Sequence, residues 1–166
     1  MPRVVIVNTH CHPITAKRKE DIAAGDLFCA VALWATNAQG DVLIAQRSLQ
    51  ENRDPGCWGP AVHGIVEENE SFLDTILRET QEEIGVTLDP AKLTTGERLA
   101  MHGTENEYFL QWYHYQLAEY ENNFTLNEEE TQKVEWLPKE EVIKRFEANP
   151  AEFVFSTPQW IAKVCV

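Results

Sequence analysis

The chain has 166 residues, a formal net charge of −13 at pH 7 and a hydrophobic fraction of 43%. This length suits one domain, spanning residues 1–166, with a sizeable single core. The acidity argues against a nucleic-acid polymer or an anionic membrane surface as a partner, because both attract basic patches. No apolar stretch approaches membrane-spanning length, so we expect no membrane segment and a cytoplasmic location.

Four cysteines are widely spaced, at positions 11, 29, 57 and 165, without a Cys-x-x-Cys pair. We expect them to be free thiols in a reducing compartment. His10 and His12 flank Cys11, a triplet that can hold a transition metal. No partner cluster at ligand spacing is present elsewhere, which favours a structural or surface role. Cys57 has no evident neighbouring base and is expected to be unreactive.

The first half of the chain is predicted to form strands and loops, from the alternation of apolar runs with turn residues. The expected order is a strand at 4–7, a polar connection at 8–26, a buried strand at 27–36, a turn at 37–41, a returning strand at 42–46 that completes a hairpin, a loop at 49–60 and a short strand at 61–66.

A helix is predicted between Ser71 and Gly85. Ser71 can cap it, Asp74 three residues later completes a capping box, and Gly85 ends it. Apolar residues recur at helical spacing along one side, at Leu73, Ile76, Leu77, Thr80 and Ile84.

The second half is predicted to alternate strands and helices, which indicates a mixed α/β fold. Strands are expected at 99–101, 108–117 and 134–137, a helix of about ten residues after Pro138, and a short final helix starting at 156. The aromatic residues of this region and of the preceding loop are expected in the core rather than stacked on a nucleobase: Trp58, Tyr108, Phe109, Trp112 and Tyr113.

Three carboxylates are expected to share one face of the 71–85 helix. At about 100° per residue, Glu82 lies about 60° to one side of Glu79 and Glu83 about 40° to the other. Like charges at three- and four-residue spacing repel one another. A hard cation with oxygen ligands, Mg²⁺ or Mn²⁺, would remove that penalty and could bring phosphates to this acidic chain.

Residues at fixed offsets accompany the triplet. Arg78 points away from the apolar side and could form a bidentate pair with Glu70, tying the preceding loop to the helix. Gly64 would permit a tight backbone path that leaves carbonyl groups facing the metal site. Asn69 precedes Glu70, and Asn tolerates a left-handed conformation.

Together these residues resemble the Nudix box: Gly64, five residues, Glu70, seven residues, then 78–86 as Arg-Glu-Thr-Gln-Glu-Glu-Ile-Gly-Val. Thr80 departs from the box, which usually has an apolar residue there, but its methyl can pack and its hydroxyl can bond to a helix carbonyl. The flanks at 30–48, 55–58 and 134–141 also resemble the family. The resemblance covers most of the chain from about residue 27 onward.

The resemblance implies a Nudix α/β/α sandwich around a mixed sheet and a hydrolase that cleaves a diphosphate linkage. Glu79, Glu82 and Glu83 would bind Mg²⁺ or Mn²⁺, with the Glu70–Arg78 pair in support. The backbone carbonyl of His63, which stands where many members have glycine, would be a further ligand. The substrate would be a small molecule, a nucleoside diphosphate derivative or a related compound. Homodimers are common in the family.

The general base is not assigned by the pattern. Glu79 is one candidate, and candidates outside the box are Glu105, Glu107 and the run Glu128-Glu129-Glu130. For the run, a solvated loop is the favoured interpretation. The polar segment 8–26 and the loop 103–107 are the expected specificity elements.

Two rival functions stay open. Isopentenyl diphosphate isomerase resembles this chain in its Pro-Gly-x-Trp loop at 55–58, but it carries a catalytic Cys-Gly-His where this chain has His63-Gly64-Ile65 and lacks the full set of helix glutamates. A non-catalytic Nudix-like domain would bind a nucleotide or a protein and need not keep the metal ligands. The complete carboxylate set favours a hydrolase over both.

Overall fold

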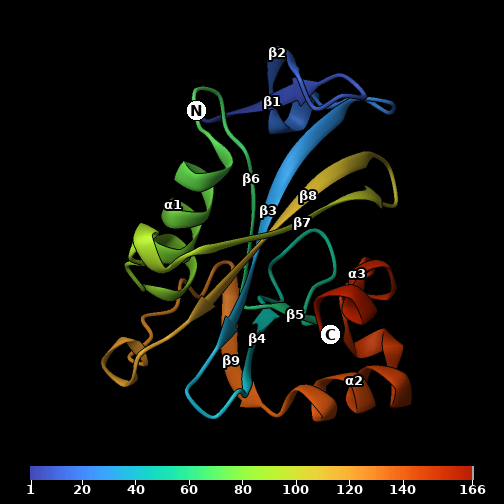
Figure 1. Ribbon diagram of the computed structural model, residues 1–166. Helices are drawn as coiled ribbons and strands as arrows, with labels where there is room; N and C mark the ends of the chain where they lie inside the picture. The colour runs from blue at the N-terminus through green and yellow to red at the C-terminus, as the bar shows by residue number, and fades with distance from the viewer. Residues whose placement is uncertain (166) are drawn as a thin grey trace.

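A nine-stranded mixed sheet with helices on both faces organises the chain (Figure 1). The computed structural model describes residues 1–165. The strands are β1 (Arg3–Val7), β2 (Pro13–Arg18), β3 (Leu27–Thr36), β4 (Val42–Arg47), β5 (Trp58–Pro60), β6 (Val62–Ile65), β7 (Thr94–His102), β8 (Glu107–Gln116) and β9 (Thr131–Leu137). The α-helices are α1 (Phe72–Ile84), α2 (Lys139–Ala148) and α3 (Thr157–Val164), and 3₁₀ turns are η1 (Lys19–Asp21), η2 (Pro90–Lys92), η3 (Glu119–Glu121) and η4 (Pro150–Glu152).

Strand β3 is the centre of the sheet. It runs parallel to β8 along its length and antiparallel to β6, which it pairs from Ala30↔Ile65 to Leu33↔Val62. Strand β4 pairs β3 only at Thr36↔Val42 and then diverges to pair β5 and β9. The predicted hairpin at 27–46 is therefore correct in its turn, but its two strands separate immediately after it.

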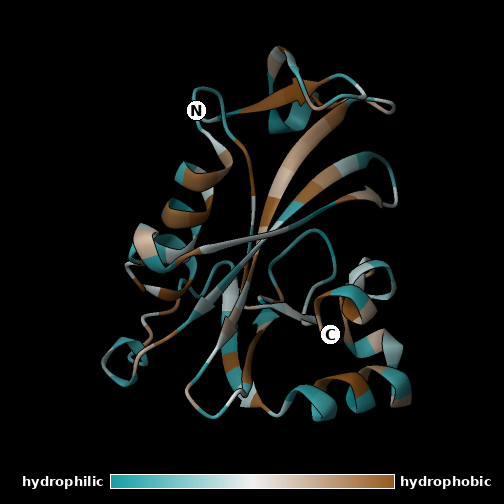
Figure 2. Cartoon of the chain, in the orientation of Figure 1, coloured by the Kyte–Doolittle hydropathy of each residue, from teal (hydrophilic) through white to brown (hydrophobic). Residues whose placement is uncertain are grey.

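Alternate residues of β3 enter two different cores, because successive side chains of a strand point to opposite faces. Val31 and Leu33 pack with Ile76 and Ile84 of α1 on one face. Ala32 and Trp34 pack on the other face in the core that includes residues of α2 and α3. Figure 2 shows apolar colour along β1 and β3 and an alternation of apolar and polar colour along the helices. This arrangement confirms the predicted α/β/α sandwich.

Several predicted elements or boundaries are wrong. The segment 8–26, predicted as a connection, contains β2, which pairs β1, and the turn η1. The loop at 49–60 ends in β5, where Trp58–Pro60 pair with β4 despite their Gly and Pro content. Strand β7 begins at Thr94 rather than 99, and its first residues are mostly exposed, so no apolar alternation announces them. Over residues 1–165, no helix combines the length and apolarity needed to cross a membrane.

Candidate active site

Helix α1 is fixed at both ends as the sequence predicts. The Ser71 hydroxyl accepts a hydrogen bond from the Asp74 amide (3.1 Å), and the Asp74 carboxylate accepts one from the Ser71 amide (2.9 Å). Gly85 ends the helix in the left-handed region, with φ of 72°. Thr80 is fully buried and its hydroxyl donates to the Ile76 carbonyl (2.7 Å). The helix therefore holds its carboxylates in a fixed orientation.

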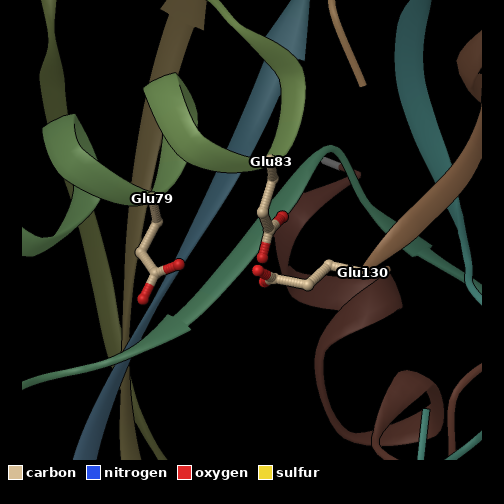
Figure 3. A group of neighbouring side chains, drawn as sticks. All are labelled: Glu79, Glu83 and Glu130. Carbon is tan, nitrogen blue, oxygen red and sulfur yellow. The ribbon is translucent and has the colours of Figure 1, made fainter. Parts of the chain in front are cut away.

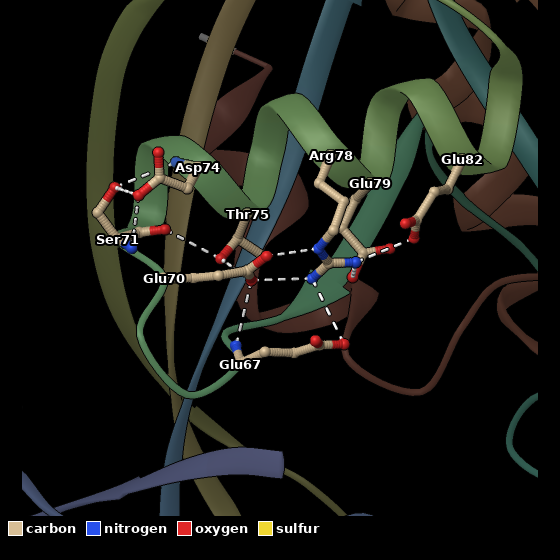
Figure 4. Close-up of polar contacts among 8 residues, drawn as sticks. All are labelled: Glu67, Glu70, Ser71, Asp74, Thr75, Arg78, Glu79 and Glu82. Atoms are coloured by element: carbon tan, nitrogen blue, oxygen red, sulfur yellow. Dashed lines mark hydrogen bonds and ion pairs between the residues drawn. The ribbon is translucent and has the colours of Figure 1, made fainter. Parts of the chain in front are cut away.

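Arg78 joins this helix to the loop before it (Figure 4). Its Nε and Nη2 donate to the two oxygens of Glu70, at 2.6 and 3.0 Å, and Nη1 lies 2.9 Å from Glu79 and 3.0 Å from Glu82. The bond from Arg78 is the main cause that lowers the pKa of Glu70. The predicted bidentate pair is confirmed, and Asn69 adopts the left-handed conformation that the loop requires, with φ of 71°.

A cluster of three carboxylates lies beside this pair. One oxygen each from Glu79, Glu83 and Glu130 lies within 4.8 Å of the others. Glu79 and Glu83 extend from the same side of α1, and Glu130 approaches from the segment before β9 with its carboxylate directed at Glu83 (Figure 3). The solvated-loop interpretation is therefore wrong for Glu130, although Glu128 and Glu129 are exposed as predicted.

Glu130 reaches the helix through backbone contacts. The last carbonyl groups of α1 lack helical partners, and here Ile84 accepts from the Thr125 amide (3.0 Å) and Glu83 from the Asn127 amide (3.0 Å). The Asn127 side chain then donates to the Glu130 carboxylate (2.8 Å). Sequence alone gives only one signal for this arrangement, an Asn three residues before the last Glu of the run.

Burial disfavours the charged form of all three carboxylates. Burial raises the pKa of Glu79 to about 7, against a lowering by the Arg78 charge. Burial raises the pKa of Glu83 well above its ordinary value, and the charges of Glu79 and Glu130 raise it further. Burial also raises the pKa of Glu130. Three acidic groups that resist ionisation together form an oxygen-ligand set that a divalent cation would stabilise.

The predicted site residues thus fall into two sets. Glu79 and Glu83 line the carboxylate cluster, whereas the Glu82 side chain is about half exposed and pairs with Arg78. Glu105 and Glu107 are exposed and pair with Arg53 and His102 respectively. Within residues 1–165, His10, Cys11 and His12 do not form a ligand group; the carboxylate cluster is the one group of that kind.

Gly64 has a steric role instead of the predicted conformational one. It lies on β6 opposite Val31 and is not among the glycines with positive φ. A Cβ built at this position would overlap the carboxyl group of Glu79. Only hydrogen in place of a side chain leaves room for Glu79 between helix and strand.

We expect Gly64→Ala to lower activity about 100-fold, because the added methyl displaces the Glu79 carboxylate and misplacement of about 1 Å has effects of that size. The measurement is steady-state kinetics with Mg²⁺, with folding checked by circular dichroism. Gly59→Ala is the matched control, since its Cβ would meet only side-chain methyl groups of Val154, at 3.3 Å. Full activity of Gly64→Ala would contradict the steric role.

Raised carboxylate pKa values predict a pH-dependent stability for the protein in EDTA. The pKa of Glu79 rises from 4.5 to about 7 on folding. Below pH 4.5 it is protonated in both states, and above about 7 the folded state must bury a charge. We expect the free energy of unfolding to fall between about pH 4.5 and 7, by about 3 kcal/mol from Glu79 alone. Urea melts across this range check it, and Glu79→Gln should flatten the slope.

His63 of β6 lies beside the carboxylate cluster. Its amide lies 3.4 Å from the Glu83 carboxylate, and burial lowers the pKa of its side chain to about 4. Its ring meets the edge of Tyr108, which stacks on Phe28 at 5.3 Å between centroids. Trp112 and Tyr113 are buried as predicted.

The chain belongs to the Nudix domain family, whose model matches residues 27–156. Isopentenyl-diphosphate Delta-isomerases of Shigella flexneri serotype 5b and Escherichia coli K12 are each 30% identical over 89 residues, 52% of this chain and 49% of theirs. The chain thus aligns with about half the length of these relatives.

Solved structures share the fold. The DR0079 protein of Deinococcus radiodurans has a TM-score of 0.78 at 20% identity, covering 97% of this chain and 98% of that one. The Nudix domain of Shewanella oneidensis NrtR, complexed with ADP ribose, has a TM-score of 0.64 at 18% identity over 87% and 88%. An Ap4A hydrolase of C. elegans has a TM-score of 0.58 at 23% identity over 75% and 90%.

Proposed function

We propose that the protein is a Mg²⁺- or Mn²⁺-dependent hydrolase that cleaves a diphosphate linkage in a nucleoside diphosphate derivative or a related small molecule. The observation that carries this proposal is the cluster of buried Glu79 and Glu83 with half-buried Glu130, beside the Arg78–Glu70 pair of a Nudix domain. Two proteins of the same fold support the substrate class, since one is complexed with ADP ribose and the other is an Ap4A hydrolase.

Glu79 and Glu83 would hold the cation, with Glu82 and the His63 carbonyl as the further ligands that the family resemblance implies. A bound divalent cation supplies charge neutralisation for the diphosphate and lowers the pKa of a water molecule. Arg78 keeps Glu79 in place through its 2.9 Å contact, and Glu70 keeps Arg78 in place.

Glu130 is the proposed general base. It is half-buried, its pKa is raised by burial, and it lies outside the helix that supplies the other carboxylates. The Asn127 side chain donates to one of its oxygens, which leaves the other to accept a proton from water. Arg47 pairs with Glu51 at 2.9 Å, and its charge lowers the pKa values of Glu83 and Glu130.

A panel assay tests this function. Nucleoside triphosphates, nucleotide sugars, dinucleotides and isoprenoid diphosphates are incubated with Mg²⁺ or Mn²⁺, and released phosphates are quantified. At least one class should be hydrolysed in a metal-dependent, EDTA-sensitive way. Binding without turnover across the panel would favour the non-catalytic alternative.

Isomerisation of isopentenyl diphosphate is the second candidate, favoured by the 30% identity to isopentenyl-diphosphate Delta-isomerases over 89 residues. Against it stand His63 at the expected thiol position and the retained helix glutamates. Proton exchange into isopentenyl diphosphate separates the two functions, and appreciable exchange would overturn the hydrolase proposal.

A further inference from the structure

Two cysteines far apart in the sequence meet in the fold. The Sγ atoms of Cys11 and Cys29 lie 2.9 Å apart. A disulfide bond is roughly 2.05 Å long, so less than about 1 Å of sulfur movement separates this contact from a covalent bond. No other cysteine pair within residues 1–165 makes such a contact.

The backbone holds each thiol in place independently. Cys11 is in the turn between β1 and β2 with φ of 61°, a conformation that L residues rarely adopt. Asn8 builds this turn: its side-chain oxygen accepts from the amides of His10 (2.9 Å) and His12 (3.0 Å), and its carbonyl accepts from the Cys11 amide (2.9 Å). Cys29 is in central strand β3, where its carbonyl accepts from the Val66 amide (2.9 Å).

The two thiols differ in access. Cys11 is partly exposed, whereas Cys29 is only 3% exposed and burial raises its thiol pKa. A dissolved oxidant therefore reacts first with Cys11. Cys29, whose Sγ lies 2.9 Å away, is then the thiol that attacks the oxidised Cys11. Cys57 instead directs its thiol at the Ala151 carbonyl, and Cys165 is buried.

We propose that Cys11 and Cys29 form a reversible internal disulfide when the protein meets a peroxide. The Cys11 sulfur attacks the peroxide oxygen, giving a sulfenic acid and one water. The Cys29 sulfur then attacks the Cys11 sulfur and releases a second water. Two thiols thus lose two protons and two electrons, and hydrogen peroxide is reduced to two waters.

The bond would fasten the N-terminal hairpin to the centre of the sheet. In the reduced protein β1 meets β3 at only two pairs, Ile6↔Phe28 and Val7↔Leu27. The disulfide encloses residues 12–28, which include β2 and η1. Closing a loop of about 17 residues restricts the unfolded chain and should raise the melting temperature by about 5–10 °C.

Peptide mapping tests the proposal. The full-length protein is treated with hydrogen peroxide, its remaining thiols are alkylated, and it is digested with trypsin without reductant. Cleavage between the two cysteines, after Lys17, Arg18 and Lys19, should leave peptides 4–17 and 20–47 joined, at a mass about 2 Da below their sum. Dithiothreitol should separate them and reverse the melting shift.

Three variants make the test decisive. Cys57→Ser should give the joined peptides as the wild type does, whereas Cys11→Ser and Cys29→Ala should give none and show no peroxide-dependent melting shift. Because Cys11→Ser and Cys29→Ala each remove one of the two thiols, the test still holds if one of these variants fails to fold. Four alkylated thiols after treatment, stable Cys11 sulfinic acid, or dimers linked between chains in place of the 4–17/20–47 pair would overturn the proposal.

Discussion

Replacing Glu83 by Gln is expected to lower kcat/KM about 1,000-fold while making the protein in EDTA more stable. The side chain keeps its shape but loses its charge, and loss of a charged metal ligand removes several kcal/mol of transition-state stabilisation. The same change removes a buried carboxyl group that is costly to ionise, because burial and the charges of two neighbouring carboxylates raise its pKa. Activity and metal-free stability should therefore move in opposite directions.

Kinetics with Mg²⁺ and melting in EDTA measure these two effects, and Mg²⁺ titration calorimetry measures the loss of the metal ligand. Gln81→Ala is the matched control on the same helix, because Gln81 is exposed and outside the carboxylate cluster. A Glu83→Gln enzyme with unchanged Mg²⁺-dependent turnover would contradict the ligand role. A variant that is inactive because it is unfolded would show itself in the melt.

The Glu130→Gln variant is expected to lose activity about 1,000-fold, within the range of about 10²–10⁴ that a general base contributes. The loss should appear mainly in kcat, because the amide still accepts a hydrogen bond from Asn127 but cannot take a proton. The acidic limb of the kcat pH profile should disappear with it.

The run itself supplies the control for this test. Glu128→Gln and Glu129→Gln remove the same charge from exposed positions one and two residues away. Both should stay within about twofold of the wild type, as exposed charges contribute little. Equal losses in all three variants would mean that net charge, and not the position of Glu130, determines activity.

Features that depend on neighbouring residues could be predicted from the sequence. The capping box, the Gly85 terminus and the bond from Thr80 to the preceding turn all join residues within four positions of one another. The Arg78–Glu70 pair could also be predicted, because helix geometry directs Arg78 away from the apolar side, where the loop before α1 presents Glu70. The sandwich followed from the box and its flanks by resemblance.

Features that depend on contacts between distant residues could not be predicted from the sequence. Glu128, Glu129 and Glu130 are identical residues in one run. Contacts in the fold distinguish Glu130, whose carboxylate accepts from the Asn127 side chain and whose carbonyl accepts from the Ser48 amide. Cys11 and Cys29 are brought together by the β1–β3 pairing, which leaves no spacing signal. Gly64 suggested a backbone conformation, whereas the closeness of Glu79 is the actual constraint.

The bonds from Thr125 and Asn127 to the end of α1 have a consequence for how this site tolerates change in length. These bonds set the position of Glu130 relative to the helix. The number of residues between the helix and Thr125 does not affect that position. We expect an insertion among residues 118–123, which are mostly exposed, to leave Glu130 in place. A single deletion between Asn127 and Glu130 would move the Glu130 carboxylate away from Glu79 and Glu83. Helix α1 and Glu130 therefore form one structural unit, and the length of the chain between the helix and Thr125 can change without moving the carboxylate.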